Sequence, residues 1–266
     1  MEKAEHNFSQ RNESILFVLL AFLFSWSIGI PLALAENGII APILPKWTHY
    51  LIPLGPLLSA LLITRISAGK AGVRNLYRRM VYIKVCPRWW AVSFFPLVLG
   101  LLLVWLLNAV TGASIRVSDL GALKYLPALG LWALPFWFFT FGIGEETGWR
   151  GFLLPRMLTG RSALSATVGV AVIWALWHAP QFFYHYPPAM LPGWLVGLTA
   201  GSIILTWLYN SASSSIFMTA IWHACFNFIT GTSADTGYLP MVISAAVIIW
   251  SLIVLIRHKP KDLLSL

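Results

Sequence analysis

The chain has 266 residues, of which 58% are hydrophobic and only 10% are charged. Soluble domains carry about 25% charged residues, so this composition excludes an ordinary soluble protein and indicates a membrane protein. The net charge of +9 does not indicate nucleic-acid binding, because the basic residues lie beside apolar segments rather than on a soluble face. We expect them to attract anionic lipid headgroups instead.

Eight apolar segments follow one another along the chain, each close to the length of about 20 residues that crosses a bilayer core. Charged, Pro/Gly or polar clusters separate them. The sequence therefore predicts an all-α fold, a polytopic transmembrane helical bundle of about eight helices over residues 15–256, with tails at 1–14 and 257–266. The expected spans are 15–35, 48–66, 91–110, 126–154, 163–184, 190–209, 213–230 and 238–256.

The distribution of Lys and Arg predicts the orientation of this bundle. With an even number of spans, fifteen of the basic residues fall on the side of the two termini and three on the other side. Because positive charge stays inside, both termini are expected in the cytoplasm. Residues 67–90 are basic and intermittently apolar, which indicates an amphipathic helix on the same face.

The first span is expected to be retained. Residues 33–35 (Ala-Leu-Ala) resemble a signal-peptide cleavage site, but the apolar run before them is longer than a signal core. The leader also contains three glutamates, which a cleaved signal rarely has. We expect a multi-pass protein of a prokaryotic plasma membrane.

Two adjacent glutamates in apolar surroundings are the first candidates for chemistry. Neighbouring residues on a helix point about 100° apart, so Glu145 and Glu146 cannot share one role. Glu146 and Arg150 are four residues apart and can form an ion pair. Glu145 has no such partner and suits a general base. An alternative places all three residues at a helix end in headgroup water, and the sequence leaves both arrangements open.

Two histidines favour the catalytic interpretation. His178 and His223 fall inside the fifth and seventh spans, and Asn227 lies one helical turn after His223. A single histidine in a helix is more often a satisfied core residue than a catalyst. Polar groups on three helices of one bundle are expected to converge, because each needs a partner in an apolar interior.

The order of these residues resembles the CAAX-protease and bacteriocin-processing (CPBP or ABI) family of intramembrane peptidases. That family carries Glu-Glu-x-x-x-Arg, then an aromatic-x-x-x-His, then His-x-x-x-Asn on successive transmembrane helices. Here these motifs are Glu145 to Arg150, Trp174 to His178, and His223 to Asn227. The resemblance covers roughly residues 141–230, and the peptidase core is placed at about 126–230. Trp174 departs from the usual Phe.

The resemblance implies a mechanism. Glu145, assisted by His178, would activate a water for attack on a peptide carbonyl, and His223 and Asn227 would stabilise the oxyanion. Glu146 and Arg150 would support the site. No cofactor is favoured, although zinc held by Glu145, His178 and His223 is the alternative; the sequence lacks a His-Glu-x-x-His motif.

The function predicted from these features is an intramembrane endopeptidase, a hydrolase whose substrate is a membrane-associated or lipidated peptide. Its site is expected to open towards the cytoplasm, and its partners are membrane lipid and the substrate, with no nucleic acid. A non-catalytic scaffold or immunity protein of the same fold and a proton-coupled transporter are the alternatives. Four tryptophans beside the motifs are expected either to pack the bundle or to line the substrate cavity: Trp149, Trp174, Trp177 and Trp222.

Overall fold

The computed structural model describes residues 2–112, 114–231, 238–259 and 261–264. Within these ranges the regular structure is helical and contains no strand, so the predicted all-α class is confirmed. Helix α1 begins at Glu2, and part of the predicted N-terminal tail is therefore helical. Residues 1, 260, 265 and 266 of the two predicted tails lie outside the described residues.

Five helical segments of the described chain are long and apolar enough to cross a membrane. Two further apolar helices, Ala163–Trp177 and Ile216–Thr230, are shorter. The count of about eight spans and the cytoplasmic placement of the termini stay predictions. The five long helices are α1 (Glu2–Glu36), α2 (Leu54–Met80), α3 (Pro87–Thr111), α8 (Leu191–Ser211) and α10 (Tyr238–Arg257).

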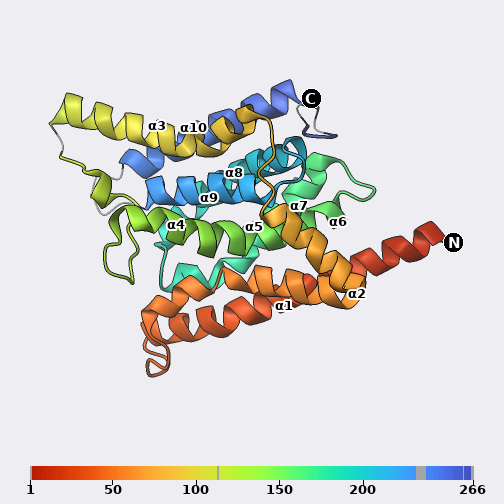
Figure 1. Cartoon of the computed structure of the whole chain (residues 1–266). Coiled ribbons are helices and arrows are strands. Elements are labelled where there is room, and N and C mark those ends of the chain that lie inside the picture. The colour runs from red at the N-terminus through yellow and green to blue at the C-terminus, as the bar shows by residue number, and fades with distance from the viewer. Residues whose placement is uncertain (1, 113, 232–237, 260, 265–266) are drawn as a thin grey trace.

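The helices form layers (Figure 1). Helices α1 and α2 pair on one side, while α3 and α10 lie on the other, and the segment carrying the two glutamates lies between them with α9 (Ile216–Thr230). Helix α7 (Ala163–Trp177) packs against α8. The two ends of the chain lie at the same end of the bundle (Figure 1). The buried core therefore surrounds the segment that carries Glu145 and Glu146.

The glutamate-bearing segment is helical throughout, but its helix changes type four times. Helix α4 (Ala133–Trp137) passes into a π-helix, Phe138–Ile143, and then into α5 (Gly144–Gly148). A second π-helix, Trp149–Leu153, leads into α6 (Leu154–Met157). The helix therefore continues beyond Arg150, so the two glutamates do not lie at a helix end. π-Segments are rare and occur frequently at functional sites.

Glycines let this segment pack closely against its neighbours. A Cβ atom at Gly144 would lie 2.7 Å from the carbonyl oxygen of Pro53, and one at Gly142 would lie 2.6 Å from that of Ala220. Real side chains do not tolerate such distances, so only glycine allows these approaches. The glutamates are thereby held between α2 and α9.

Two expected elements have different boundaries in the structure. The fifth span was predicted over 163–184, but α7 ends at Trp177 and a 3-10 helix follows over Ala179–Phe183. Pro180 lacks an amide hydrogen and so removes a backbone hydrogen bond that would continue α7, which favours a break here, although α1 and α3 continue through Pro31 and Pro96. The fourth span was predicted from 126, but the helix begins at Gly130, after Pro127.

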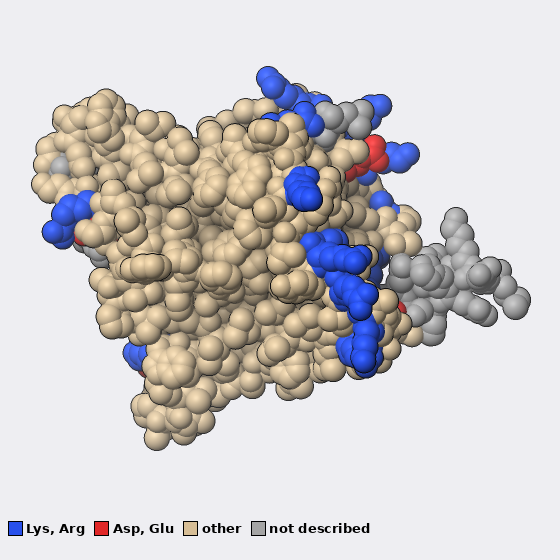
Figure 2. All heavy atoms as spheres, in the orientation of Figure 1, with Lys and Arg blue, Asp and Glu red and all other residues tan. Residues whose placement is uncertain are grey.

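The basic connection predicted as a helix over 67–90 is helical only in part: residues up to Met80 belong to α2, residues 81–86 are not helical, and α3 begins at Pro87. Helix α2 is kinked at Gly69, whose φ of 63° is in the left-handed region that favours glycine. Lys and Arg side chains gather at the end of the molecule where the chain termini lie (Figure 2). Arg150 is an exception to the sequence-based count, because it is fully buried instead of contributing to this surface.

Candidate active site

Glu146 is the centre of a buried ionic network. Its Oε1 accepts a hydrogen bond of 3.1 Å from Arg150 Nη1, and both side chains are 0% exposed. The predicted ion pair is therefore present. The same oxygen is 2.9 Å from Nδ1 of His223, and Arg150 Nη2 donates to the Ser202 hydroxyl at 3.0 Å. Because burying charges is costly, this pairing is what allows Glu146 and Arg150 to lie in the interior.

Glu145 has a different environment, as the helical geometry predicts. Its Oε2 accepts a hydrogen bond of 2.6 Å from the indole nitrogen of Trp174. Glu145 is only 1% exposed. No ion pair involves Glu145 in the described part of the chain. It is thus a buried carboxylate that is oriented by a neutral donor rather than neutralised by a cation.

Trp174 connects the residues of the three motifs. Besides donating to Glu145, its carbonyl oxygen accepts a hydrogen bond of 2.8 Å from His178 Nδ1. The Arg150 guanidinium lies 4.7 Å from the centre of the Trp174 ring, and the His223 ring lies 5.6 Å away, edge to face. The sequence indicated Trp174 only as a lining residue. The Phe that is usual at this motif position has no N–H group. The presence of Trp in the sequence could therefore have indicated the hydrogen bond to Glu145.

His178 caps α7 instead of lying within a continuous span. Its φ and ψ of −78° and −7° place it at the junction with the following 3-10 helix. The bond from Nδ1 to the Trp174 carbonyl fixes the proton on Nδ1 and leaves Nε2 as the unprotonated nitrogen of the neutral ring. The ring is flanked by Trp177 at 4.7 Å and by Trp194 at 4.9 Å. Nε2 is therefore the nitrogen that is available for proton exchange.

Asn227 lies on α9 one turn beyond His223, as the spacing predicts. It is half-buried, whereas His223 is only 6% exposed. The two residues therefore present polar groups from one helix at different depths.

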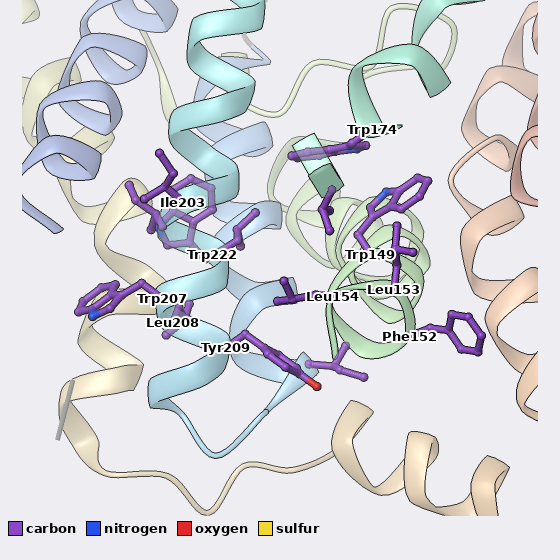
Figure 3. Packing of buried hydrophobic residues seen from close by; sticks show 14 of the residues in the cluster. Trp149, Phe152, Leu153, Leu154, Trp174, Ile203, Trp207, Leu208, Tyr209 and Trp222 are labelled. Carbon is purple, nitrogen blue, oxygen red and sulfur yellow. The ribbon is translucent and has the colours of Figure 1, made fainter. Parts of the chain in front are cut away.

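The four tryptophans of the motifs are all buried. Trp149 packs edge to face against Trp177 with a ring separation of 5.8 Å, while Trp222 stacks on Phe226 at 5.6 Å. Figure 3 shows Trp149 and Trp174 with Leu153 and Leu154 among the buried residues around the glutamate-bearing segment. Trp174 contacts Glu145 directly, and Trp177 packs on Trp149 of the segment that carries the glutamates.

Two residues in this environment were not found by sequence reasoning. Ser202 on α8 is fully buried and accepts from Arg150, and Trp194 packs on His178. Ser202 stands between two other hydroxyl residues, Thr199 and Thr206, at helical spacing in an apolar span. This spacing places the three hydroxyl side chains on one face of the helix. The sequence could therefore have predicted a polar face on α8.

The alternative zinc site requires Glu145, His178 and His223 to converge. Among the described residues, no group of three or more His, Cys, Asp or Glu side chains has the arrangement that could hold a metal ion. Nδ1 of His223 and Oε2 of Glu145 are bonded to Glu146 and Trp174, so Nε2 and Oε1 are the ligand atoms that these two residues have left. The absence of a cofactor stays a prediction.

Comparison with known proteins shows which family this chain is similar to. The family described as "Type II CAAX prenyl endopeptidase Rce1-like" matches residues 127–229, which include every motif residue from Glu145 to Asn227. The family resemblance is confirmed. The chain is also 25% identical over 233 residues to "CAAX prenyl protease 2" of Methanococcus maripaludis, covering 76% of this chain and 82% of the relative. At family level these similarities support a hydrolase, specifically an intramembrane endopeptidase.

Proposed function

We propose that this chain hydrolyses a peptide bond of a membrane-associated or lipidated peptide, with Glu145 as the group that activates water. The observation that carries this proposal is the contrast between the two glutamates. Glu146 is ion-paired with Arg150 and bonded to His223, whereas Glu145 is held only by a neutral indole donor. A buried carboxylate without a cationic partner is well suited to accept a proton.

In the proposed reaction, Glu145 accepts a proton from water as the water oxygen attacks the peptide carbonyl carbon. His178 assists through Nε2, because its Nδ1 is committed to the Trp174 carbonyl. The proton is then delivered to the leaving amine as the carbon–nitrogen bond breaks. Trp174 would orient both groups, since its indole N–H and its carbonyl oxygen bind Glu145 and His178 respectively.

The developing negative charge on the carbonyl oxygen needs a donor, and we assign this role to His223 and Asn227. For Nε2 of His223 to donate, the ring must carry protons on both nitrogens. The Glu146 carboxylate, 2.9 Å from Nδ1, would supply the compensating negative charge. Preorganised donors of this kind typically contribute about 10²–10³ in rate. Arg150 would hold Glu146 in place for this purpose.

The class of substrate follows from the apolar surroundings of the site and from the similarity to CAAX prenyl proteases. Trp149, Trp174 and Trp177 would shield the water and accept an apolar substrate group. We expect a C-terminal peptide that carries a lipid, which approaches from the end of the bundle where Lys and Arg gather. This end is the cytoplasmic one by the charge bias of the sequence.

The test uses the full chain in liposomes with a prenylated CAAX-type peptide, an identical peptide without the lipid, and product identification by mass spectrometry. The proposal expects release of the C-terminal peptide from the prenylated substrate by wild type and not by Glu145→Ala. Cleavage by wild type should be unaffected by a chelator. Equal cleavage by a folded Glu145→Ala protein would overturn the proposed mechanism. Activity that a chelator removes and zinc restores would assign a metalloenzyme instead.

A further inference from the structure

A second feature of the molecule is a cavity that lies apart from the motif residues. Its volume is about 530 Å³, and it opens between the second half of α2, the last turns of the glutamate-bearing segment and the C-terminal end of α8. It is lined by neither Glu145, His178, His223 nor Asn227. Its polar lining consists mainly of Asn75, Arg79, Arg156, Tyr209, Asn210 and Ser214.

Arg79 provides this cavity with unused hydrogen-bonding capacity. Its Nη1 donates to the Tyr209 hydroxyl at 2.6 Å, which fixes the side chain. Its Nε is buried and has no hydrogen-bond partner in the described part of the protein. Other atoms of Arg79 line the cavity, and the rest of its guanidinium can donate to an acceptor bound there. The guanidinium offers a planar set of donors that matches the oxygens of a phosphate or carboxylate.

The charge of the cavity favours an anion. Arg156 is neutralised by Glu13, since their Nη2 and Oε2 atoms are 2.7 Å apart. Asn210 donates to the backbone oxygen of Asp262 at 3.0 Å, so its amide faces that segment. Among the described residues, Arg79 forms no ion pair with a carboxylate. The cavity thus contains one positive charge that is not neutralised by the protein.

The position of the cavity indicates where its ligand comes from. Two of its lining residues, Arg79 and Arg156, are basic, and Lys and Arg gather at one end of the bundle (Figure 2). On α2, the exposed residues near the cavity include both apolar and basic side chains: Ile66 is 72% and Tyr77 59% exposed, and Arg74 and Arg78 are exposed as well. A helix with this mixture lies at the level of the lipid headgroups. Phosphate groups are the anions that are concentrated there.

The kink in α2 is what creates the space. Gly69 has a φ of 63°, and the helix turns at this residue, between Thr64 and Asn75 of the cavity wall. Gly72 is required by the same bend, because a Cβ atom there would lie 2.4 Å from the Cβ atom of Ala68. Gly69 and Gly72 therefore allow the bend of α2 that shapes the cavity wall.

From these observations we infer that the cavity binds a phosphate group, with Arg79 as its main ligand and an anionic phospholipid headgroup as its source. The bound headgroup connects α2, α6 and α8. It therefore stabilises the end of the segment that carries Glu145 without contacting the catalytic candidates.

The experiment titrates the full chain in neutral detergent with short-chain phosphatidylglycerol or phosphatidylcholine, and native mass spectrometry measures the bound lipid. Arg79→Gln should weaken phosphatidylglycerol binding about tenfold, because it removes a charged hydrogen bond. Arg74→Gln is the matched control on the same helix, since Arg74 is exposed and does not line the cavity. Asn75→Phe is the second variant, which fills the cavity from an exposed helix position and preserves every charge.

The inference expects preferential binding of phosphatidylglycerol that Arg79→Gln and Asn75→Phe weaken and Arg74→Gln does not. Inorganic phosphate is the probe that tests whether free phosphate, rather than a lipid headgroup, is the ligand. If it competes with the lipid and binds equally well alone, the phosphate site stands and free phosphate is its ligand. Equal losses in Arg79→Gln and Arg74→Gln would show general charge attraction and overturn the site. Equal binding of both lipids by wild type, with no effect of phosphate, would also overturn it.

Discussion

The interior of this bundle contains two polar clusters that each include a pair of histidines. The first, which we call the glutamate cluster, contains His178 and His223 with Glu145, Glu146 and Arg150. Its charged groups are almost completely buried, and an ion pair, an indole donor and a serine hydroxyl hold them in place.

The second, the tyrosine–histidine cluster, lies where the 3-10 helix Lys46–Leu51 meets the segment after α7. His49 and His185 stack with their ring centres 4.2 Å apart. A hydrogen bond of 2.8 Å joins His49 Nδ1 to the Tyr184 hydroxyl, and one of 3.3 Å joins His185 Nδ1 to the Tyr125 hydroxyl. Lys124 donates to the backbone oxygen of His185 at 3.3 Å. None of these hydrogen-bond partners is a carboxylate.

The difference between the clusters shows what a pair of buried histidines requires to become a candidate catalytic site. In the tyrosine–histidine cluster, neutral hydroxyl and imidazole groups satisfy one another and connect three segments of chain. In the glutamate cluster, charges are retained in the interior despite the cost of burying them. Glu145 carries a buried charge that a hydrogen bond orients but no cation of the described chain neutralises. This feature distinguishes the candidate catalytic site from a cluster that only stabilises the fold.

A large change is expected from His178→Ala, which should lower kcat about 10³-fold, as loss of an assisting acid–base group does. His185→Ala, in the other cluster, should leave kcat unchanged. Initial rates on the prenylated peptide, with both variants verified as folded, test this contrast. A comparable loss in both variants would remove the distinction between the two clusters.

A smaller effect is expected from Trp174→Phe. This change retains an aromatic ring but removes the indole N–H that donates to Glu145 at 2.6 Å. Because one hydrogen bond to a carboxylate is lost, kcat should fall about ten- to hundredfold, with KM unaffected. Separate measurement of kcat and KM decides the point. A loss as large as that of His178→Ala would mean that the indole takes part in the chemistry.

Ser202→Ala should affect stability more than activity. It leaves Nη2 of the buried Arg150 without its acceptor, which costs about 1–3 kcal/mol. Thr206→Val is the matched control one turn further along α8, because the Thr206 hydroxyl is buried without a hydrogen-bond partner in the described chain. Thermal unfolding in detergent should show a lower midpoint for Ser202→Ala alone. Equal midpoints for the two variants would contradict the support assigned to Ser202.

The smallest effect concerns pH. Burial lowers the pKa of His185, in the connection after α7, to about 4 from an ordinary value of 6.5, and the Lys124 charge contributes to this. Between these values the unfolded chain binds the proton more readily than the folded one, so stability falls as the pH is lowered from about 6.5 towards 4.

The unfolding midpoint should therefore drop by a few °C between about pH 7.5 and about pH 5. In His185→Gln this drop should be smaller, because one of the groups that take up a proton on unfolding is gone. The matched measurement is thermal unfolding of both proteins at both pH values. An unchanged pH dependence in the variant would show that His185 does not contribute.

The sequence predicted those features of the site that depend on spacing within one helix. The Glu146–Arg150 pair and the divergence of Glu145 both follow from the helical repeat. Contacts between different helices could not be predicted from spacing. The spacing within one helix does not show which residue of another helix lies next to it. The Trp174–Glu145 bond, the Ser202–Arg150 bond and the contact of His223 with Glu146 belong to this class.

The sequence likewise predicted the helical class and the apolar segments of the fold. It did not predict where individual helices break or change type. Composition and segment length indicated the helical class. The end of α7 at Trp177 and the two π-helices around Glu145 depend on local backbone bonding, which hydrophobic periodicity does not report. Pro180 was a local signal for the break at His178, because proline removes a backbone hydrogen bond from a helix.

The most direct test of the account compares wild type with Glu145→Gln and Glu146→Gln for turnover of the prenylated peptide. Glutamine preserves the size of each side chain but cannot accept the proton from water. The account predicts that Glu145→Gln remains folded and loses at least about 10³ in kcat. Glu146→Gln should lower the unfolding midpoint, because it removes the partner of Arg150. Undiminished turnover by a folded Glu145→Gln protein would contradict the central claim.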